Sequence, residues 1–111
     1  MYRYVYKTAL KTKILINRLL QDRGNLDKQD FFGKPLAHEL EYIIELIDNS
    51  LKGCDIDKND LKSLNDGIPD LSIVISSVIL FLELYDNITN ESFIELKEKY
   101  EKYYEQIKKE A

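Results

Sequence analysis

The sequence contains few of the residues that interrupt helices or carry most protein chemistry. Of its 111 residues, one is cysteine, one is histidine, two are proline and four are glycine. The single cysteine, Cys54, excludes a disulfide within the chain and makes a reducing compartment the simpler expectation. Sparse proline and glycine leave room for long uninterrupted helices. Because the first residues hold no apolar run of signal-peptide length, we expect a cytoplasmic protein.

The longest uncharged stretch runs from Leu71 to Leu82 and reads LSIVISSVILFL. Its apolar residues occur in every direction around a helix axis, which indicates an element that is buried on all sides. The stretch would also suit a buried strand, but Pro69 and Asp70 before it and helical patterns on both sides favour a helix. It is shorter than the ~20 apolar residues that cross a bilayer. We therefore expect a central helix and no membrane span.

Amphipathic patterns with helical spacing occupy most of the remaining chain. They predict an all-α fold, a single-domain bundle over residues 1–111 with four main helices at about 2–22, 35–52, 69–86 and 91–108. The helices are expected to be antiparallel around the central one, with additional short turns near 27–32 and 58–65. Pro35 suits the first helical position, and Gly53 is expected to end the second helix.

The net charge of −4 is unevenly distributed along the chain. Residues 1–23 have a balance of +5, whereas residues 36–95 have a balance of −10. A basic first helix and an acidic middle are consistent with a bundle in which neighbouring helices attract each other. A nucleic-acid partner is not favoured, because proteins that bind nucleic acids usually carry a strong basic excess.

The first predicted helix carries a cationic stripe opposite its apolar side. The candidate partner-binding residues are Arg3, Tyr4, Lys7, Lys11 and Arg18. One interpretation is a solvated face, neutralised in part by acids of the second helix. The other is a docking surface for an acidic partner or for a phosphate backbone. The sequence leaves both interpretations open.

The segment Asp55 to Asp66 has some features of a calcium-binding loop. Asp55, Asp57 and Asn59 occupy ligand positions one, three and five. Position six is Asp60 where the sharp turn needs glycine, and position twelve is Asp66 rather than the bidentate glutamate. The mismatches favour the competing interpretation, a short helix with Asp57 as its N-cap. We therefore expect no calcium site.

Other metal or catalytic sites also have little support in the sequence. His38 has no cysteine or second histidine near it in sequence, so a zinc site is not expected. The chain has no glycine-rich phosphate loop and no nucleophile with a paired histidine. We expect no catalytic residue, no metal and no cofactor.

The best enzymatic alternative uses four acids. They are Glu41, Glu45, Asp66 and Asp70. All-α nucleotide pyrophosphohydrolases hold magnesium with paired acids on two neighbouring helices, and this spacing resembles theirs loosely. The two acids of each pair are four residues apart, so these acids do not form the ExxE and ExxD signatures of those enzymes. The common alternative is that four carboxylates of an acidic chain face solvent.

The leading functional hypothesis is a small non-enzymatic binding protein that acts through the complementarity of its helix surfaces. In size and architecture the chain is similar to small helical immunity proteins and to accessory subunits of bacterial or viral assemblies. Its expected partner is another protein. The alternatives are the magnesium-dependent nucleotide pyrophosphohydrolase-like enzyme and a phosphate-backbone-contacting subunit of a nucleoprotein assembly.

Overall fold

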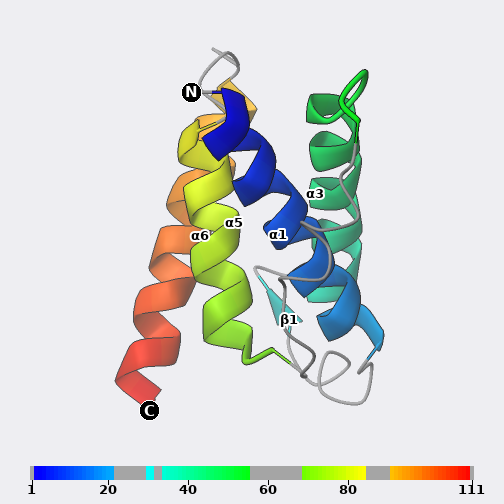
Figure 1. Cartoon of the computed structure of the whole chain (residues 1–111). Helices are drawn as coiled ribbons and strands as arrows, with labels where there is room; N and C mark the ends of the chain where they lie inside the picture. Colours follow the sequence, from blue (N-terminus) through cyan, green and yellow to red (C-terminus); the bar gives the residue numbers. More distant parts are fainter. Residues whose placement is uncertain (1, 22–29, 32–33, 56–68, 85–90, 111) are drawn as a thin grey trace.

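Four helices make up most of the described chain (Figure 1). The computed structural model describes residues 2–21, 30–31, 34–55, 69–84 and 91–110. The helices are α1 (Tyr2–Gln21), α3 (Leu36–Ser50), α5 (Leu71–Leu84) and α6 (Glu91–Glu110). The predicted all-α bundle is confirmed, and the predicted ends of all four helices agree with the structure to within two residues.

A short strand pair precedes α3. β1 (Asp30–Phe31) pairs antiparallel with β2 (Lys34–Pro35), with Asp30 opposite Pro35. The helical turn predicted near 27–32 is therefore wrong for Asp30 and Phe31, whereas the turn predicted near 58–65 lies outside the described residues. Pro35 is the residue before the helix rather than its first residue, because its extended backbone belongs to the strand pair.

The C-terminal end of α3 is closed by a turn that uses a glycine. The N–H of Leu51 donates to the Ile47 carbonyl, and the N–H of Cys54 donates to the Leu51 carbonyl, both at 2.9 Å. Gly53 has a φ of 84°, in the left-handed region that glycine enters without steric cost. Gly53 thus follows the end of the helix, as its place in the sequence predicts.

The helices that contact each other most closely run in opposite directions. α5 lies between α1 and α6 and contacts both, and α1 also contacts α3 (Figure 1). α1 and α6 run one way along the bundle, whereas α3 and α5 run the other way. α3 and α5 are parallel, and both begin at the same end of the bundle (Figure 1).

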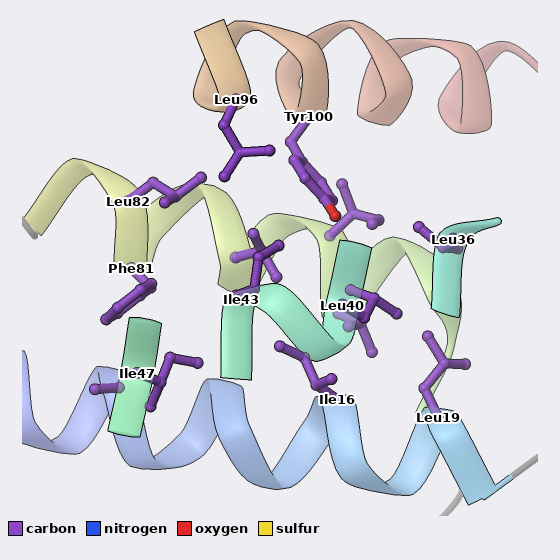
Figure 2. Packing of buried hydrophobic residues seen from close by; sticks show 14 of the residues in the cluster. Ile16, Leu19, Leu36, Leu40, Ile43, Ile47, Phe81, Leu82, Leu96 and Tyr100 are labelled. Atoms are coloured by element: carbon purple, nitrogen blue, oxygen red, sulfur yellow. The ribbon is translucent and has the colours of Figure 1, made fainter. Parts of the chain in front are cut away.

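One apolar face of each helix contributes to a shared core (Figure 2). The buried residues of α3 are spaced by three or four positions, so that they form a single stripe. The fully buried apolar side chains of the core are Ala9, Ile16, Leu36, Leu40, Ile43, Ile47, Val74, Ile75, Val78, Phe81 and Tyr100. Burying each large aliphatic side chain stabilises the fold by ~1.5–3 kcal/mol.

The apolar helix α5 is not buried on all sides. Val74, Ile75 and Phe81 are fully buried, but Ile73 is 51% exposed and Leu80 is 37% exposed. The prediction of a helix covered in every direction is therefore wrong for one side. Its composition indicates how apolar the helix is, but the number of neighbouring helices decides how many of its sides are covered.

The two sides of α5 should respond differently to a buried charge. We expect Ile75→Asp to unfold the chain, because an uncompensated buried charge costs several kcal/mol against a total stability of roughly 5–15 kcal/mol. Ile73→Asp places the same carboxylate on the exposed side and should change stability by about 0.5 kcal/mol or less. Thermal melting followed by far-ultraviolet circular dichroism compares the two. If Ile75→Asp melts with the wild type, α5 does not line the core.

Candidate functional site

A buried pair of hydroxyl groups joins α1 to α5. Thr12 Oγ1 lies 2.6 Å from Ser77 Oγ and 2.7 Å from the Thr8 carbonyl oxygen. Because the threonine hydroxyl has one proton, it can donate to Thr8 while Ser77 donates to Thr12. Both hydroxyls are thereby satisfied in the core. This pair fixes which side of α1 faces α5.

Two ion pairs hold α3 against the helices on either side of α5. Lys13 of α1 lies 2.5 Å from Asp48, and Lys99 of α6 lies 3.1 Å from Glu39. α3 therefore bridges α1 and α6, and its apolar stripe covers the side of α5 that faces the core (Figure 2). α1 and α6 contact α5 on two sides, and the core to which α3 contributes lies on a third side. Within the described part of the chain, a fourth side of α5 carries exposed residues.

The uncovered side of α5 is an apolar stripe with one small polar residue in its middle. Ile73, Ser76 and Leu80 are exposed and follow each other at intervals of three and four residues, so they share one side of the helix. These three residues form the open face. The Ser76 hydroxyl donates to the Ile73 carbonyl at 3.0 Å, which satisfies its proton within the helix.

Lysines of α1 flank the open face. Successive residues of a helix are rotated by about 100°, so Lys11 and Lys13 turn to opposite sides of Thr12. Lys13 reaches α3, and Lys11 therefore lies on the side away from α3, next to the open face. Lys7 and Arg18 lie four residues before and seven residues after Lys11 on the same side of the helix. Lys7, Lys11 and Arg18 form the α1 rim.

The other flank of the open face is formed by α6 and has mixed charge. Lys97 lies 3.6 Å from Glu83 of α5 and 3.6 Å from Glu101. Lys108 follows Glu101 by seven residues, which is about two helical turns. Its ammonium lies 4.8 Å from the centre of the Tyr104 ring. Lys97, Tyr104 and Lys108 are spaced by seven and four residues on one side of the helix and form the α6 rim.

The structure separates the sequence-predicted docking residues into three groups. Lys7 and Lys11 are exposed, and neither forms an ion pair within the described part of the chain. Arg18 is half-buried and has an interaction partner. The side chains of Arg3 and Tyr4 lie outside the described residues. Two acids of α3, Asp48 and Glu39, pair with Lys13 and Lys99, and within the described residues no acid of α3 pairs with Lys7 or Lys11. The proposed neutralisation by α3 therefore does not reach these two lysines.

Sequence reasoning did not identify Ile73 and Leu80 as surface residues. Their apolar neighbours in sequence suggested that they were buried, and no signal in the pattern marks them as different. The sequence pattern likewise does not mark Lys97, Tyr104 and Lys108 as a rim of this surface. The pairing of Lys97 with Glu83 across two helices depends on packing, which the sequence pattern does not define.

The acidic and metal-binding candidates do not form a site within the described residues. Glu41, Glu45 and Asp70 are exposed, and no group of three potential ligands is found in that part of the chain. Asp66 and nearly all of the Asp55–Asp66 segment lie outside the described residues. His38 and Cys54 are both exposed. Among the described helices, none combines the length and hydrophobicity that crossing a membrane requires.

A buried tyrosine lies on the opposite side of α5 from the open face. Tyr100 extends from α6 toward α3 and is fully buried (Figure 2). Burial and the negative charge of the nearby Glu39 carboxylate raise the pKa of Tyr100 far above the usual range. The phenol therefore stays neutral in the folded protein, where the ring packs in the shared core.

Comparison with known proteins adds no relative to these observations. The chain matches no family model, no curated protein and no solved structure. The geometry of its surface is therefore the basis for a functional proposal.

The hydroxyl pair between α1 and α5 predicts a specific stability pattern. Thr12→Val removes the acceptor of the Ser77 hydroxyl and should lower the free energy of unfolding by about 1–3 kcal/mol. Adding Ser77→Ala to Thr12→Val should recover part of that loss, because no hydroxyl is then left without its partner. Thr12→Ser, the matched control, keeps the hydroxyl and should cost about 1 kcal/mol. Equal losses for valine and serine in urea titrations would contradict the role of the pair.

The raised pKa of Tyr100 predicts a loss of stability in alkali. The unfolded chain releases the phenol proton near the ordinary value of about 10, whereas the folded chain retains it. The stabilisation is therefore complete below pH 10 and declines above it, by up to about 1.4 kcal/mol per pH unit. Urea titrations between pH 9 and about 11 should show a steeper decline for the wild type than for Tyr100→Phe. Tyr42→Phe, at an exposed site, should behave as the wild type.

Proposed function

We propose that this chain is a small cytoplasmic, non-enzymatic binding protein whose protein partner docks on the open face of α5. In this role it would act as immunity-type proteins or accessory subunits do, by covering a surface of its partner. The observation that carries the proposal is that the most apolar helix exposes Ile73 and Leu80 between two rims that contain lysine. No chemistry at this surface requires a cofactor.

The arrangement has the anatomy of a binding surface. Protein interfaces combine an apolar centre, which excludes water, with a polar rim that sets specificity. On the open face the centre is aliphatic and the rims carry Lys7, Lys11, Lys97 and Lys108. Isolated apolar residues on a surface are common, but here the two belong to one side of one helix and share flanking charges.

The unpaired lysines of α1 support a role in association rather than in folding. An exposed ion pair stabilises a fold by about 1 kcal/mol at most, and Lys7 and Lys11 form none within the described residues. Exposed charges beside an apolar centre accelerate the encounter with a partner of opposite charge. Lys7 and Lys11 therefore contribute little to the stability of the chain and are available to a partner.

Charge reversal on the α1 rim tests this proposal. Lys7→Glu combined with Lys11→Glu should change the free energy of unfolding by less than about 1 kcal/mol. Capture of the partner from an extract of the source cells should fall, and the remaining capture should depend less on salt concentration. Glu41→Lys combined with Glu45→Lys, on the outer side of α3, is the matched control and should preserve capture.

Two outcomes would contradict the proposal. A loss of stability with intact capture would show that the α1 rim serves the fold. Magnesium-dependent hydrolysis of a nucleoside triphosphate that Glu41→Gln abolishes would show that the chain is an enzyme.

A further inference from the structure

We infer that the open face binds an amphipathic α-helix of the partner, with aliphatic residues on its contact side and acidic residues on the flank next to α1. This inference rests on the proposed function and specifies the chemistry of the partner. It follows from the spacing of the exposed apolar residues, from the small residue between them and from the unequal charges of the two rims.

The spacing of the open face suits a helix that lies along α5. Ile73 and Leu80 are seven residues apart, which is about two helical turns or 10.5 Å. A partner helix with aliphatic residues at the same interval can contact both side chains in the manner of a coiled coil. Contact with both, plus half a turn at each end, requires a partner segment of about three turns, or roughly 11 residues.

Ser76 leaves space for an apolar side chain between Ile73 and Leu80. It is exposed and much smaller than its two neighbours on the open face. Its hydroxyl already donates to the Ile73 carbonyl at 3.0 Å. An aliphatic side chain of the partner can therefore cover Ser76 without leaving its proton unsatisfied, a loss that would otherwise weaken binding. We therefore expect an aliphatic side chain of the partner helix to pack over Ser76, between Ile73 and Leu80.

The unequal charge of the rims places the acidic flank of the partner. Lys97 on the α6 rim is balanced by Glu83 and Glu101, each at 3.6 Å. Lys7 and Lys11 on the α1 rim have no such carboxylate within the described residues.

On the α6 rim, Lys108 lies over the Tyr104 ring and is the one lysine of that rim that forms no ion pair within the described residues, whereas the α1 rim has two such lysines and no acid of its own. The attraction for an anion is therefore stronger on the α1 side. We therefore expect the highest affinity for a partner helix whose acidic residues face α1 and whose opposite flank is uncharged.

The same carboxylates argue against a flat anionic surface as the occupant. A bilayer or a nucleic-acid backbone would meet Glu83 and Glu101 at the same time as it met the lysines, and like charges repel. A helix presents charge on one flank only, so that it meets Lys7 and Lys11 while it avoids the two acids. This selectivity favours a protein helix over a lipid surface or a phosphate backbone.

Photocrosslinking from the open face identifies the occupant directly. p-Benzoylphenylalanine replaces Leu80 in the purified full chain, which is irradiated in an extract of the source cells. The same photoreactive residue in place of Glu45, on the outer side of α3, is the matched control. Mass spectrometry of the crosslinked peptides gives the sequence that lies on each surface.

We expect position 80 to capture a peptide with aliphatic residues at helical spacing and acidic residues on one flank. Lys7→Glu with Lys11→Glu should reduce this capture by about tenfold, the effect of one lost favourable charge contact of moderate strength. Changing the acidic residues of the captured segment to lysine should restore capture by this doubly substituted chain. That reciprocal rescue separates direct contact from a change in folding.

Other captured species would overturn the inference, and they differ in what they imply for the proposed function. A neutral or basic protein segment at position 80 would refute the acidic helix while leaving a binding function for the open face. Lipid, nucleic acid or a second copy of the chain would refute the inference and the protein partner together. Equal yields from positions 80 and 45 would show that the open face is not a docking surface.

Discussion

The hydrogen bond between Thr12 and Ser77 is the contact on which the orientation of the surface depends. Two buried hydroxyls must satisfy each other, because leaving one without a partner costs about 1–3 kcal/mol. This requirement turns one side of α1 toward α5. Lys13 then reaches α3, and Lys11 is turned to the opposite side, beside the open face. A polar contact inside the core thus determines which lysines flank an apolar stripe on the surface.

Charge and packing together give the bundle two different sides. Asp48 and Glu39 form ion pairs that connect α3 to α1 and to α6. Two of the acids in the middle of the chain thus lie at contacts between helices. The remaining acids of α3, Glu41 and Glu45, point to solvent. The lysines of the α1 rim lie on the other side of the bundle. The molecule is therefore acidic where α3 covers the core and basic beside the uncovered side of α5.

Periodicity predicted α1, α3 and α6 well because each of them repeats apolar residues at intervals of three and four positions. α5 has no such repeat and was predicted from Pro69 and Asp70 before it and from the helical patterns on both sides. The exposure of Lys7 and Lys11 was predictable for a related reason, since an amphipathic helix cannot bury its charged side. Ile73 and Leu80 could not be predicted, because α5 is apolar on every side and only the arrangement of the other helices leaves one side open. The strand pair in which Asp30 lies opposite Pro35 was also not predicted from the sequence, because strands of two residues are too short to show a periodic pattern.

Cysteine accessibility on α5 tests the central claim, that one side of this apolar helix is open. Single cysteines replace Ile73, Leu80, Ile75 or Val78 in a Cys54→Ser background, which removes the exposed native thiol. The account predicts rapid modification by a neutral thiol reagent at positions 73 and 80, and modification at 75 and 78 only on unfolding. Equal protection at all four positions would show that α5 is covered on every side and would contradict the account.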